Sequence, residues 1–210
     1  MTIAMIGATG LVGRQLWPLL QEKHDLLVLG RRPCGAAREK LGKMEEWPGL
    51  LQGERIDAAV STLGSIRKAA GSWAAFEAVD RHAVLAFAEA ARAAGAPHFL
   101  LVSSSGADAN SRNAYLRLKG EVEEAVAALG FERVDVLRPG LLLGKRSERR
   151  LAEGAAQVIA PLLGLLLKGR LDRYGPIDAR QVAQAMAALT GRQEPGVYRH
   201  HNREIRTLAA

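Results

Sequence analysis

Short runs of consecutive apolar residues alternate along this chain with longer stretches in which apolar residues recur at helical spacing. Runs of this length are typical of strands that are buried on both faces of a parallel sheet. The clearest runs are residues 3–6, 26–29, 56–62, 99–102 and 134–137, and residues 197–201 are expected to add an edge strand. Strands that alternate with helices predict an α/β protein with a doubly wound parallel sheet, the Rossmann fold.

The helical stretches between these runs have recognisable beginnings and ends. Residues 14–23 and 72–94 carry apolar residues on one face, a further helix begins near Asn113, and Asp178 is placed to cap a helix that runs to Thr190. Pro18 lies inside the first of these helices and is expected to kink or shorten it.

Two regions give a weaker pattern. Between residues 34 and 55 we expect a short helix around residues 36–43 and at most an abbreviated third strand. Residues 151–167 form an apolar helical stretch, interrupted near Pro161 and Gly164, that either lines a substrate pocket or packs in the core. We therefore expect one domain over residues 1–210, with a small substrate region from about residue 141 onward.

A glycine-rich turn follows the first apolar run directly. It is Gly7-Ala8-Thr9-Gly10-Leu11-Val12-Gly13, and a helical pattern comes next. Glycine permits a tight turn and a close approach of the backbone to a phosphate, and the following helix directs its free N–H groups and positive dipole end toward the same place. Its position after a strand makes a dinucleotide site the favoured interpretation over an ordinary strand-to-helix turn.

The end of the second apolar run carries Arg31 and Arg32, where NAD-preferring folds have an acidic residue that binds the ribose 2′-hydroxyl. Guanidinium groups suit phosphate oxygens instead. The sequence therefore predicts NADP(H) rather than NAD(H), the alternative being two solvated loop arginines. Leu63, Gly64 and Ser65, at the end of the run over residues 56–62, are further candidate cofactor contacts or a plain strand-end turn.

Composition narrows the classes of protein further. The chain has 210 residues, 48% hydrophobic and 24% charged, with a net charge of +7 and a single cysteine, Cys34. Its basic residues are scattered, apart from small clusters at residues 31–32 and 145–150, and lack interleaved aromatic residues, so nucleic acid is not an expected partner. The longest nearly apolar run, residues 158–167, is about half the length that spans a bilayer, so a membrane is not expected either. The adjacent His200 and His201 would face opposite sides of a strand, so we expect no metal site. A lone cysteine and the lack of a secretory signal predict a cytoplasmic location.

The candidate chemistry lies on the helix that begins near Asn113. Tyr115 and Lys119 are four residues apart, so they share one helix face with Cβ atoms about 5–6 Å apart. A free tyrosine has a pKa near 10. A nearby ammonium group favours the phenolate and so lowers this pKa toward the range in which the hydroxyl can act as a general acid or base at neutral pH. A serine from the strand end at residues 103–105 can hydrogen-bond the same substrate oxygen.

These motifs resemble those of the atypical short-chain dehydrogenases/reductases, and more narrowly those of the HIV Tat-interacting-protein-like oxidoreductases. The resemblance extends over most of the chain. Besides the glycine turn, it includes Gly30-Arg31-Arg32, Ser61-Thr62-Leu63-Gly64, Val79-Asp80-Arg81, His98-Phe99, Ser103-Ser104, Gly106-Ala107-Asp108, Tyr115-Leu116, Lys119-Gly120-Glu121-Val122-Glu123 and Arg138-Pro139-Gly140.

The resemblance implies that Tyr115 is the catalytic acid/base and that Lys119 binds the ribose hydroxyls. It also implies that Ser104 orients the substrate, with Ser103 and Ser105 as alternatives because the three serines are consecutive. Leu142 and Arg150 are implied to lie near the cofactor.

Together these features predict an NADP(H)-dependent oxidoreductase that acts on a small carbonyl or alcohol substrate, which the apolar C-terminal stretch suggests is hydrophobic. Two alternatives stay open. One is a regulatory or partner-binding protein that senses NADP(H), and the other is an isomerase or epimerase of the same superfamily. The sequence does not predict the oligomeric state.

Overall fold

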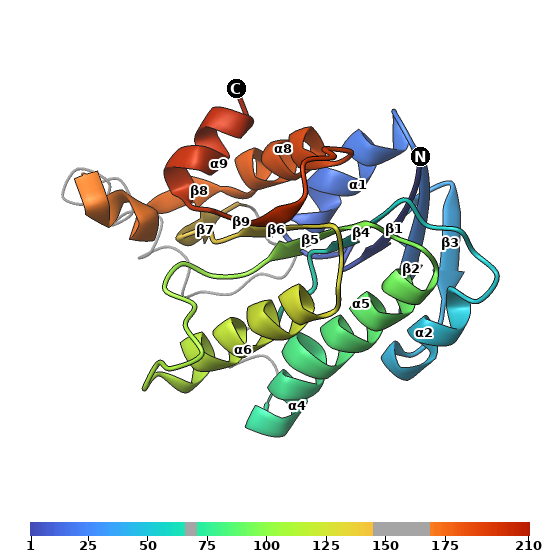
Figure 1. Ribbon diagram of the computed structural model, residues 1–210, viewed down its shortest axis with the longest axis horizontal. Coiled ribbons are helices and arrows are strands. Elements are labelled where there is room, and N and C mark those ends of the chain that lie inside the picture. The colour runs from blue at the N-terminus through green and yellow to red at the C-terminus, as the bar shows by residue number, and fades with distance from the viewer. Residues whose placement is uncertain (66–70, 145–168) are drawn as a thin grey trace.

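A parallel sheet between two layers of helices forms the frame of the molecule (Figure 1). The computed structural model describes residues 1–65, 71–144 and 169–210. In this part of the chain the main sheet has seven strands in the order β3-β2-β1-β4-β5-β6-β9, and every neighbouring pair is parallel. The strand order reverses between β1 and β4, which is where folds of this kind bind ligands. The predicted fold class, a doubly wound parallel sheet in a single domain, is confirmed.

The strands of the main sheet are short and mostly buried. They are β1 (Thr2–Ile6), β2 (Asp25–Gly30), β3 (Arg38–Leu41), β4 (Ala58–Ser61), β5 (His98–Val102), β6 (Arg133–Leu137) and β9 (Gly196–His200). The last is the predicted edge strand. Two further strands, β7 (Leu141–Leu143) and β8 (Pro176–Asp178), pair in parallel to form a small second sheet.

Helices cover both faces of the main sheet (Figure 1). One layer holds α2 (Trp47–Leu50), α4 (Trp73–Glu77), α5 (Val84–Ala93) and α6 (Ala114–Ala128). The other holds α1 (Gly13–Gln21), α8 (Ala179–Leu189) and α9 (Asn202–Leu208). Short 3-10 turns are η1 (Met44–Glu46) and η3 (Gly169–Tyr174). Pro18 lies inside α1, which ends at Gln21, and Asp178 caps α8 as expected by accepting the Arg180 N–H at 2.7 Å.

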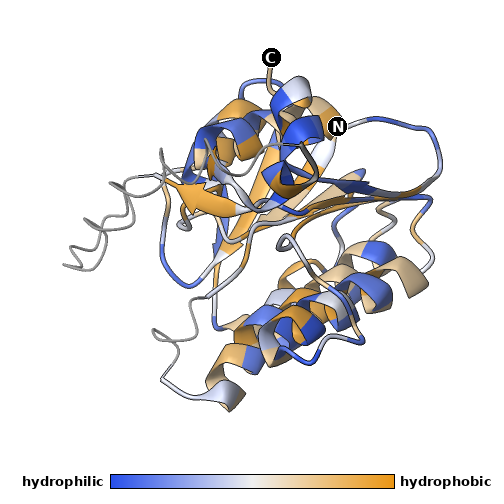
Figure 2. Cartoon of the chain, turned by 90° about the vertical axis from the view of Figure 1, so that its left-hand side faces the viewer, coloured by the Kyte–Doolittle hydropathy of each residue, from blue (hydrophilic) through white to orange (hydrophobic). Residues whose placement is uncertain are grey.

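Successive side chains along each strand point to opposite faces of the sheet and pack in two separate hydrophobic cores. Ile6, Phe99 and Val136 point into the core under α5 and α6. Met5 and Leu100 point into the core under α1 and α8. Figure 2 shows hydrophobic strands between helices that carry hydrophilic residues as well. Burial on both faces explains why the strands appear in the sequence as continuous apolar runs.

The prediction of a short helix around residues 36–43 is wrong. Residues 38–41 instead form the edge strand β3, which pairs with β2 over Leu27–Gly30. Arg38 is held there by Asp25 and Glu54, at 2.7 and 2.5 Å. These partners are remote in sequence, so the strand is formed by tertiary contacts that no local pattern records.

The predicted helix over residues 72–94 is confirmed, and it contains an irregularity. Ser72 caps it by accepting the Ala75 N–H at 3.1 Å. Between α4 and α5, the segment η2 (Ala78–Ala83) is π-helical. Residues 151–167, the predicted apolar helical stretch, lie outside the described residues. No helix in the described part of the chain is long and apolar enough to cross a membrane.

Candidate dinucleotide and catalytic site

The glycine turn over residues 7–13, called the cradle below, packs against neighbouring backbone too closely to admit side chains at Gly7 and Gly13. Gly7 has a φ of +84°, and a Cβ there would lie 2.5 Å from the Leu63 nitrogen. A Cβ on Gly13 would lie 2.1 Å from the Gly7 carbonyl oxygen. The Gly10 amide donates to that oxygen at 2.9 Å. These positions therefore require glycine, and their close packing brings the turn, the loop after β4 and the start of α1 together, as in the phosphate-binding turn of a Rossmann fold.

The N-terminus of α1 faces this cradle without a capping side chain. Val12 occupies the cap position and makes no side-chain hydrogen bond. The amides of Leu11 and Val12 donate no hydrogen bond within the described part of the chain. Free amides at a helix N-terminus favour an anionic ligand, so Gly7 to Gly13 fit the phosphate-binding role expected of them.

The loop after β4, which carries the candidate cofactor contacts Leu63, Gly64 and Ser65, lies against the glycine turn. Thr62 donates both its amide and its hydroxyl to the Ile6 carbonyl, at 3.1 and 3.2 Å. Leu63 is in contact distance of Gly7. A Cβ on Gly64 would lie 3.9 Å from the Lys119 ammonium nitrogen. Residues 62–64 thus connect the cradle to the candidate catalytic lysine through continuous contacts.

The two arginines after β2 are both exposed. Neither Arg31 nor Arg32 forms an ion pair with an acidic side chain in the described part of the chain. Their position at the carboxyl end of β2 is the one at which this fold meets the adenosine ribose.

Tyr115 and Lys119 share one face of α6, as their spacing predicts. Asn113 caps the helix by accepting the amides of Tyr115 and Leu116 at 3.0 and 3.3 Å. The Tyr115 ring packs against Phe76, with ring centroids 5.9 Å apart. Its hydroxyl makes no hydrogen bond to the residues that the structure describes.

Lys119 has a buried counter-ion that sequence reasoning missed. Its ammonium nitrogen lies 2.7 Å from Oδ1 of Asp80, which is only 1% exposed. Oδ2 of Asp80 accepts the amide and the hydroxyl of Ser65, at 2.8 and 2.7 Å. One carboxylate therefore fixes both the lysine and the end of the loop after β4. Asp80 lies in the π-helical segment, and only its place in the quoted motif Val79-Asp80-Arg81 drew attention to it.

The three serines after β5 have different surroundings. Ser103 is buried and donates its hydroxyl to Glu123 at 2.5 Å. The Ser105 hydroxyl is buried, and the described part of the chain offers it no hydrogen-bond partner. Ser104 is partly exposed, and its hydroxyl has only a long contact, 3.4 Å, with the Ser105 carbonyl oxygen. Of the three hydroxyls, that of Ser104 is the most available to a ligand.

A second buried carboxylate lies one helical turn beyond Lys119. Glu123 is 1% exposed and accepts hydrogen bonds from Arg138 at 2.5 to 3.1 Å in addition to the bond from Ser103. Tyr115, Lys119 and Glu123 follow one another at intervals of four along the same face of α6. The motifs that contain Glu123 and Arg138 were both noted in the sequence, but their contact was not predicted.

Leu142, for which the resemblance implies a cofactor contact, lies in the small second sheet, whereas Arg150 lies outside the described residues. Leu142 is in β7 and pairs with Ile177 of β8. Nearby, a Cβ on Gly144 would lie 2.8 Å from the side chain of Leu11 in the glycine turn. The end of β7 therefore approaches the cradle.

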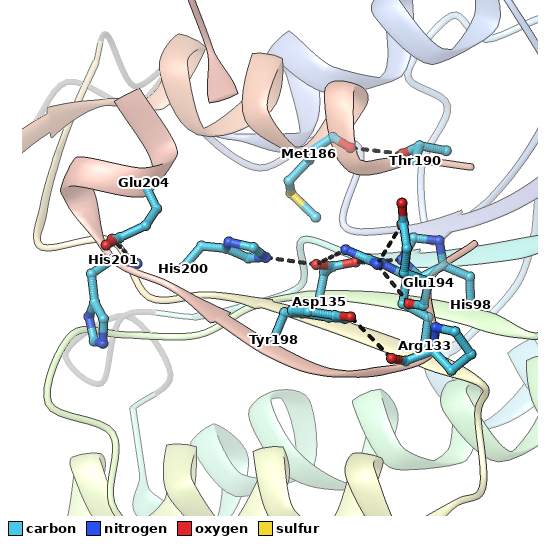
Figure 3. A network of polar contacts seen from close by, with 11 residues as sticks. His98, Arg133, Asp135, Met186, Thr190, Glu194, Tyr198, His200, His201 and Glu204 are labelled. Carbon is cyan, nitrogen blue, oxygen red and sulfur yellow. Dashed lines mark hydrogen bonds and ion pairs between the residues drawn. The ribbon is translucent and has the colours of Figure 1, made fainter. Parts of the chain in front are cut away.

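A third buried acidic group, Asp135 of β6, lies on the opposite face of the sheet (Figure 3). It is 0% exposed and accepts hydrogen bonds from Arg133 at 2.6 and 3.0 Å. His98 and His200 contact its two oxygens at 2.8 and 2.7 Å. Burial alone would raise the pKa of Asp135, but hydrogen bonds from His200, His98 and Arg133 outweigh it and hold the pKa well below its ordinary value.

Comparison with known proteins agrees with this geometry. A family model described as the NAD dependent epimerase/dehydratase family matches residues 3–198. The arrangement defines an NAD(P)-binding Rossmann protein of the extended short-chain dehydrogenase/reductase class. The chain belongs to the NAD dependent epimerase/dehydratase family.

Several curated fungal proteins are similar over almost their whole length. Protein FMP52, mitochondrial, of Coccidioides immitis is 34% identical over 99% of this chain and 93% of its own. Protein fmp52, mitochondrial, of Emericella nidulans is 39% identical over 92% of this chain and 91% of its own. Protein FMP52-1, mitochondrial, of Scheffersomyces stipitis is 38% identical over 99% of this chain and 98% of its own.

These names contradict the expected cytoplasmic location, which is therefore wrong. The cysteine count could not distinguish the cytoplasm from another reducing compartment, because both keep a lone thiol reduced.

Solved structures share the fold at lower identity. MoeE5 in complex with UDP-glucose and NAD is 17% identical with a TM-score of 0.68, over 95% of this chain and 75% of its own. Human epimerase family protein SDR39U1 with NADPH is 18% identical with a TM-score of 0.65, over 96% and 74%. UDP-glucose 4-epimerase of Thermus thermophilus with NAD is 17% identical with a TM-score of 0.70, over 100% and 81%.

Proposed function

We propose that this protein is an NADP(H)-dependent oxidoreductase that interconverts a carbonyl and an alcohol on a small, hydrophobic substrate. The observation that supports this most is the line of contacts from Gly7 through Leu63 and Gly64 to Lys119. It joins the phosphate cradle to the face of α6 that carries Tyr115. The resemblance to the Tat-interacting-protein-like oxidoreductases supports the same chemistry.

The chain's own groups have distinct roles in this proposal. When bound, the nicotinamide cofactor supplies or accepts the hydride. Tyr115 gives a proton to the substrate oxygen, or removes it in the reverse direction, and Ser104 donates a hydrogen bond to the same oxygen. The Lys119 ammonium has three N–H donors. Because one of them is directed to Asp80, two are left for the ribose hydroxyls.

The preference for NADP(H) over NAD(H) rests on Arg31 and Arg32. Their guanidinium groups are exposed at the end of β2, where they can bind a 2′-phosphate. The substrate side is proposed to come from residues 141–210, of which the end of β7 lies near Leu11 of the glycine turn.

Replacing Tyr115 with Phe tests the catalytic assignment. The expected result is loss of NADPH oxidation with every carbonyl compound that the wild-type protein reduces, and unchanged NADPH affinity, because only the phenolic hydroxyl is removed. Tyr198→Phe is the matched control, since the Tyr198 hydroxyl donates to the Pro195 carbonyl at the sheet edge. Turnover in Tyr115→Phe at the wild-type rate contradicts the assignment.

The family match and the epimerases among the structural neighbours favour one alternative, a redox-neutral epimerase that keeps its cofactor bound. Carbonyl-dependent oxidation of free NADPH supports the oxidoreductase. Conversion of a sugar nucleotide without net change in cofactor absorbance supports the epimerase. NADPH binding with neither reaction supports a sensor.

A further inference from the structure

The loop that carries the two arginines is held by one acidic side chain. The consecutive amides of Cys34, Gly35 and Ala36 all donate to Oε1 of Glu39, at 3.1, 2.7 and 2.6 Å. The thiol of Cys34 lies 3.3 Å from the same oxygen. Successive backbone amides that converge on one point form an anion-binding nest, and here the anion is part of the chain.

The nest binds the charged form of the carboxylate. Burial alone would raise the pKa of Glu39, but hydrogen bonds from Cys34, Ala36 and Gly35 outweigh it and lower the pKa below its ordinary value. Gly35 has a φ of +96°, which only glycine adopts without strain and which lets successive amides point inward. The loop conformation and the ionised Glu39 therefore stabilise each other.

The nest fixes the arginines because it lies so close to them. Gly30 is anchored in the sheet, where its carbonyl accepts the Gly42 amide at 3.0 Å. The nest begins at Cys34, so only residues 31–33 span the two anchors. Residue 33 is a proline, whose ring fixes φ. With both ends of so short a span held, Arg31 and Arg32 leave the backbone at defined positions.

We infer that Glu39 is a positioning residue that sets the preference of this site for the 2′-phosphate of NADP(H), by holding the arginine turn in its binding conformation. This inference rests on the proposed function, because it assumes that Arg31 and Arg32 meet that phosphate. Preorganised cations bind an anion more tightly than mobile ones, since less conformational entropy is lost on binding.

Dissociation constants for NADPH and NADH, measured by fluorescence titration, test this role. In Glu39→Ala the NADPH affinity is expected to fall about tenfold while the NADH affinity stays within about twofold, because NADH does not use the arginine turn. Glu39→Gln keeps a side-chain oxygen for the amides and is expected to retain an intermediate preference.

Glu54→Ala is the matched control. Glu54 also lies beside β3, where it pairs with Arg38 and Lys40 at 2.5 and 2.8 Å, and its carboxylate forms no hydrogen bond with the described residues 31–36. Its loss weakens the same sheet edge and is expected to leave the NADPH/NADH ratio unchanged. An equal fall of the ratio in Glu54→Ala would mean that Glu39 acts only through edge stability, which overturns the inference.

Two other outcomes also decide the matter. If wild-type protein prefers NADPH and Glu39→Ala keeps or increases that preference, the positioning role is wrong while the proposed cofactor stands. If wild-type protein does not prefer NADPH, the proposed cofactor is wrong and the inference fails with it.

Discussion

Both faces of the sheet bury carboxylates, but the residues that these carboxylates contact differ between the two faces. On the face covered by α6, Asp80 and Glu123 are each 1% exposed and hold Lys119 and Ser103. On the face covered by α8, Asp135 is 0% exposed and holds Arg133 between two histidines. The first pair contacts the candidate catalytic groups, whereas the second cluster joins β5, β6 and β9 to one another. Burial of a charge therefore does not by itself mark a functional site; its partners do.

The largest expected effect is on stability, at Asp135. Asp135→Asn removes the negative charge and leaves the buried Arg133 with only the exposed Glu194, at 3.3 Å, as an acidic partner. Breaking such a pair typically lowers the free energy of unfolding by about 3–5 kcal/mol. Urea denaturation measures the loss, and turnover per folded molecule should not change. A helix-cap variant, Asp178→Ala, gives a reference loss of about 1 kcal/mol. A loss no larger than this reference would mean that the cluster contributes little to the fold.

The next effect is on turnover, at Asp80. Asp80→Asn keeps an acceptor for Ser65 but leaves the Lys119 ammonium without its partner and free to shift. Small displacements of positioned groups cost up to about 100-fold in rate, so we expect kcat to fall about 10- to 100-fold, measured as NADPH oxidation.

Asp57→Asn is its control, because Asp57 accepts the Thr2 amide at 2.7 Å at the other end of the sheet. If Asp80→Asn lost stability as Asp135→Asn does and kept its kcat, the two faces would not differ in the way we describe.

The smallest effect is a dependence of stability on acid pH. The pKa of Asp135 is lowered in the folded protein from an ordinary value of 3.8. Its contribution to stability is therefore complete above that value and is lost as pH falls below it, by at most about 1.4 kcal/mol per pH unit. Unfolding in urea at pH 6, 4 and 3 should show the difference between wild type and Asp135→Asn shrinking at pH 3. If the difference in unfolding free energy between the two proteins stayed constant with pH, groups other than Asp135 would be responsible for the loss of stability in acid.

Most of the sheet, the glycine turn and the shared helix face of Tyr115 and Lys119 could be predicted because their signals are local. The apolar runs indicated the buried strands, and the spacing of Gly7, Gly10 and Gly13 indicated the cradle. The four-residue interval between Tyr115 and Lys119 placed both on one helix face.

What could not be predicted depends on contacts between distant residues. Asp80 meets Lys119 across 39 positions, and β3 is defined by its pairing with β2 over Leu27–Gly30. Glu39 is only a few residues from the amides of its nest, but nothing in the sequence distinguishes it from the other polar residues of this irregular stretch. The nest is formed by backbone amides in one particular loop conformation. The pattern of side chains in the sequence therefore does not predict it.

The π-helical segment Ala78–Ala83 has an implication for how this protein can change. A π-turn accommodates one extra residue within an otherwise α-helical run and is frequently found at functional sites. Deleting one residue would let the helix wind regularly while Phe76 and Phe87 kept their core. The side chains inside the segment would change their direction, and Asp80 would then lose its contact with Lys119. A laboratory selection for activity should therefore leave the irregular segment in place.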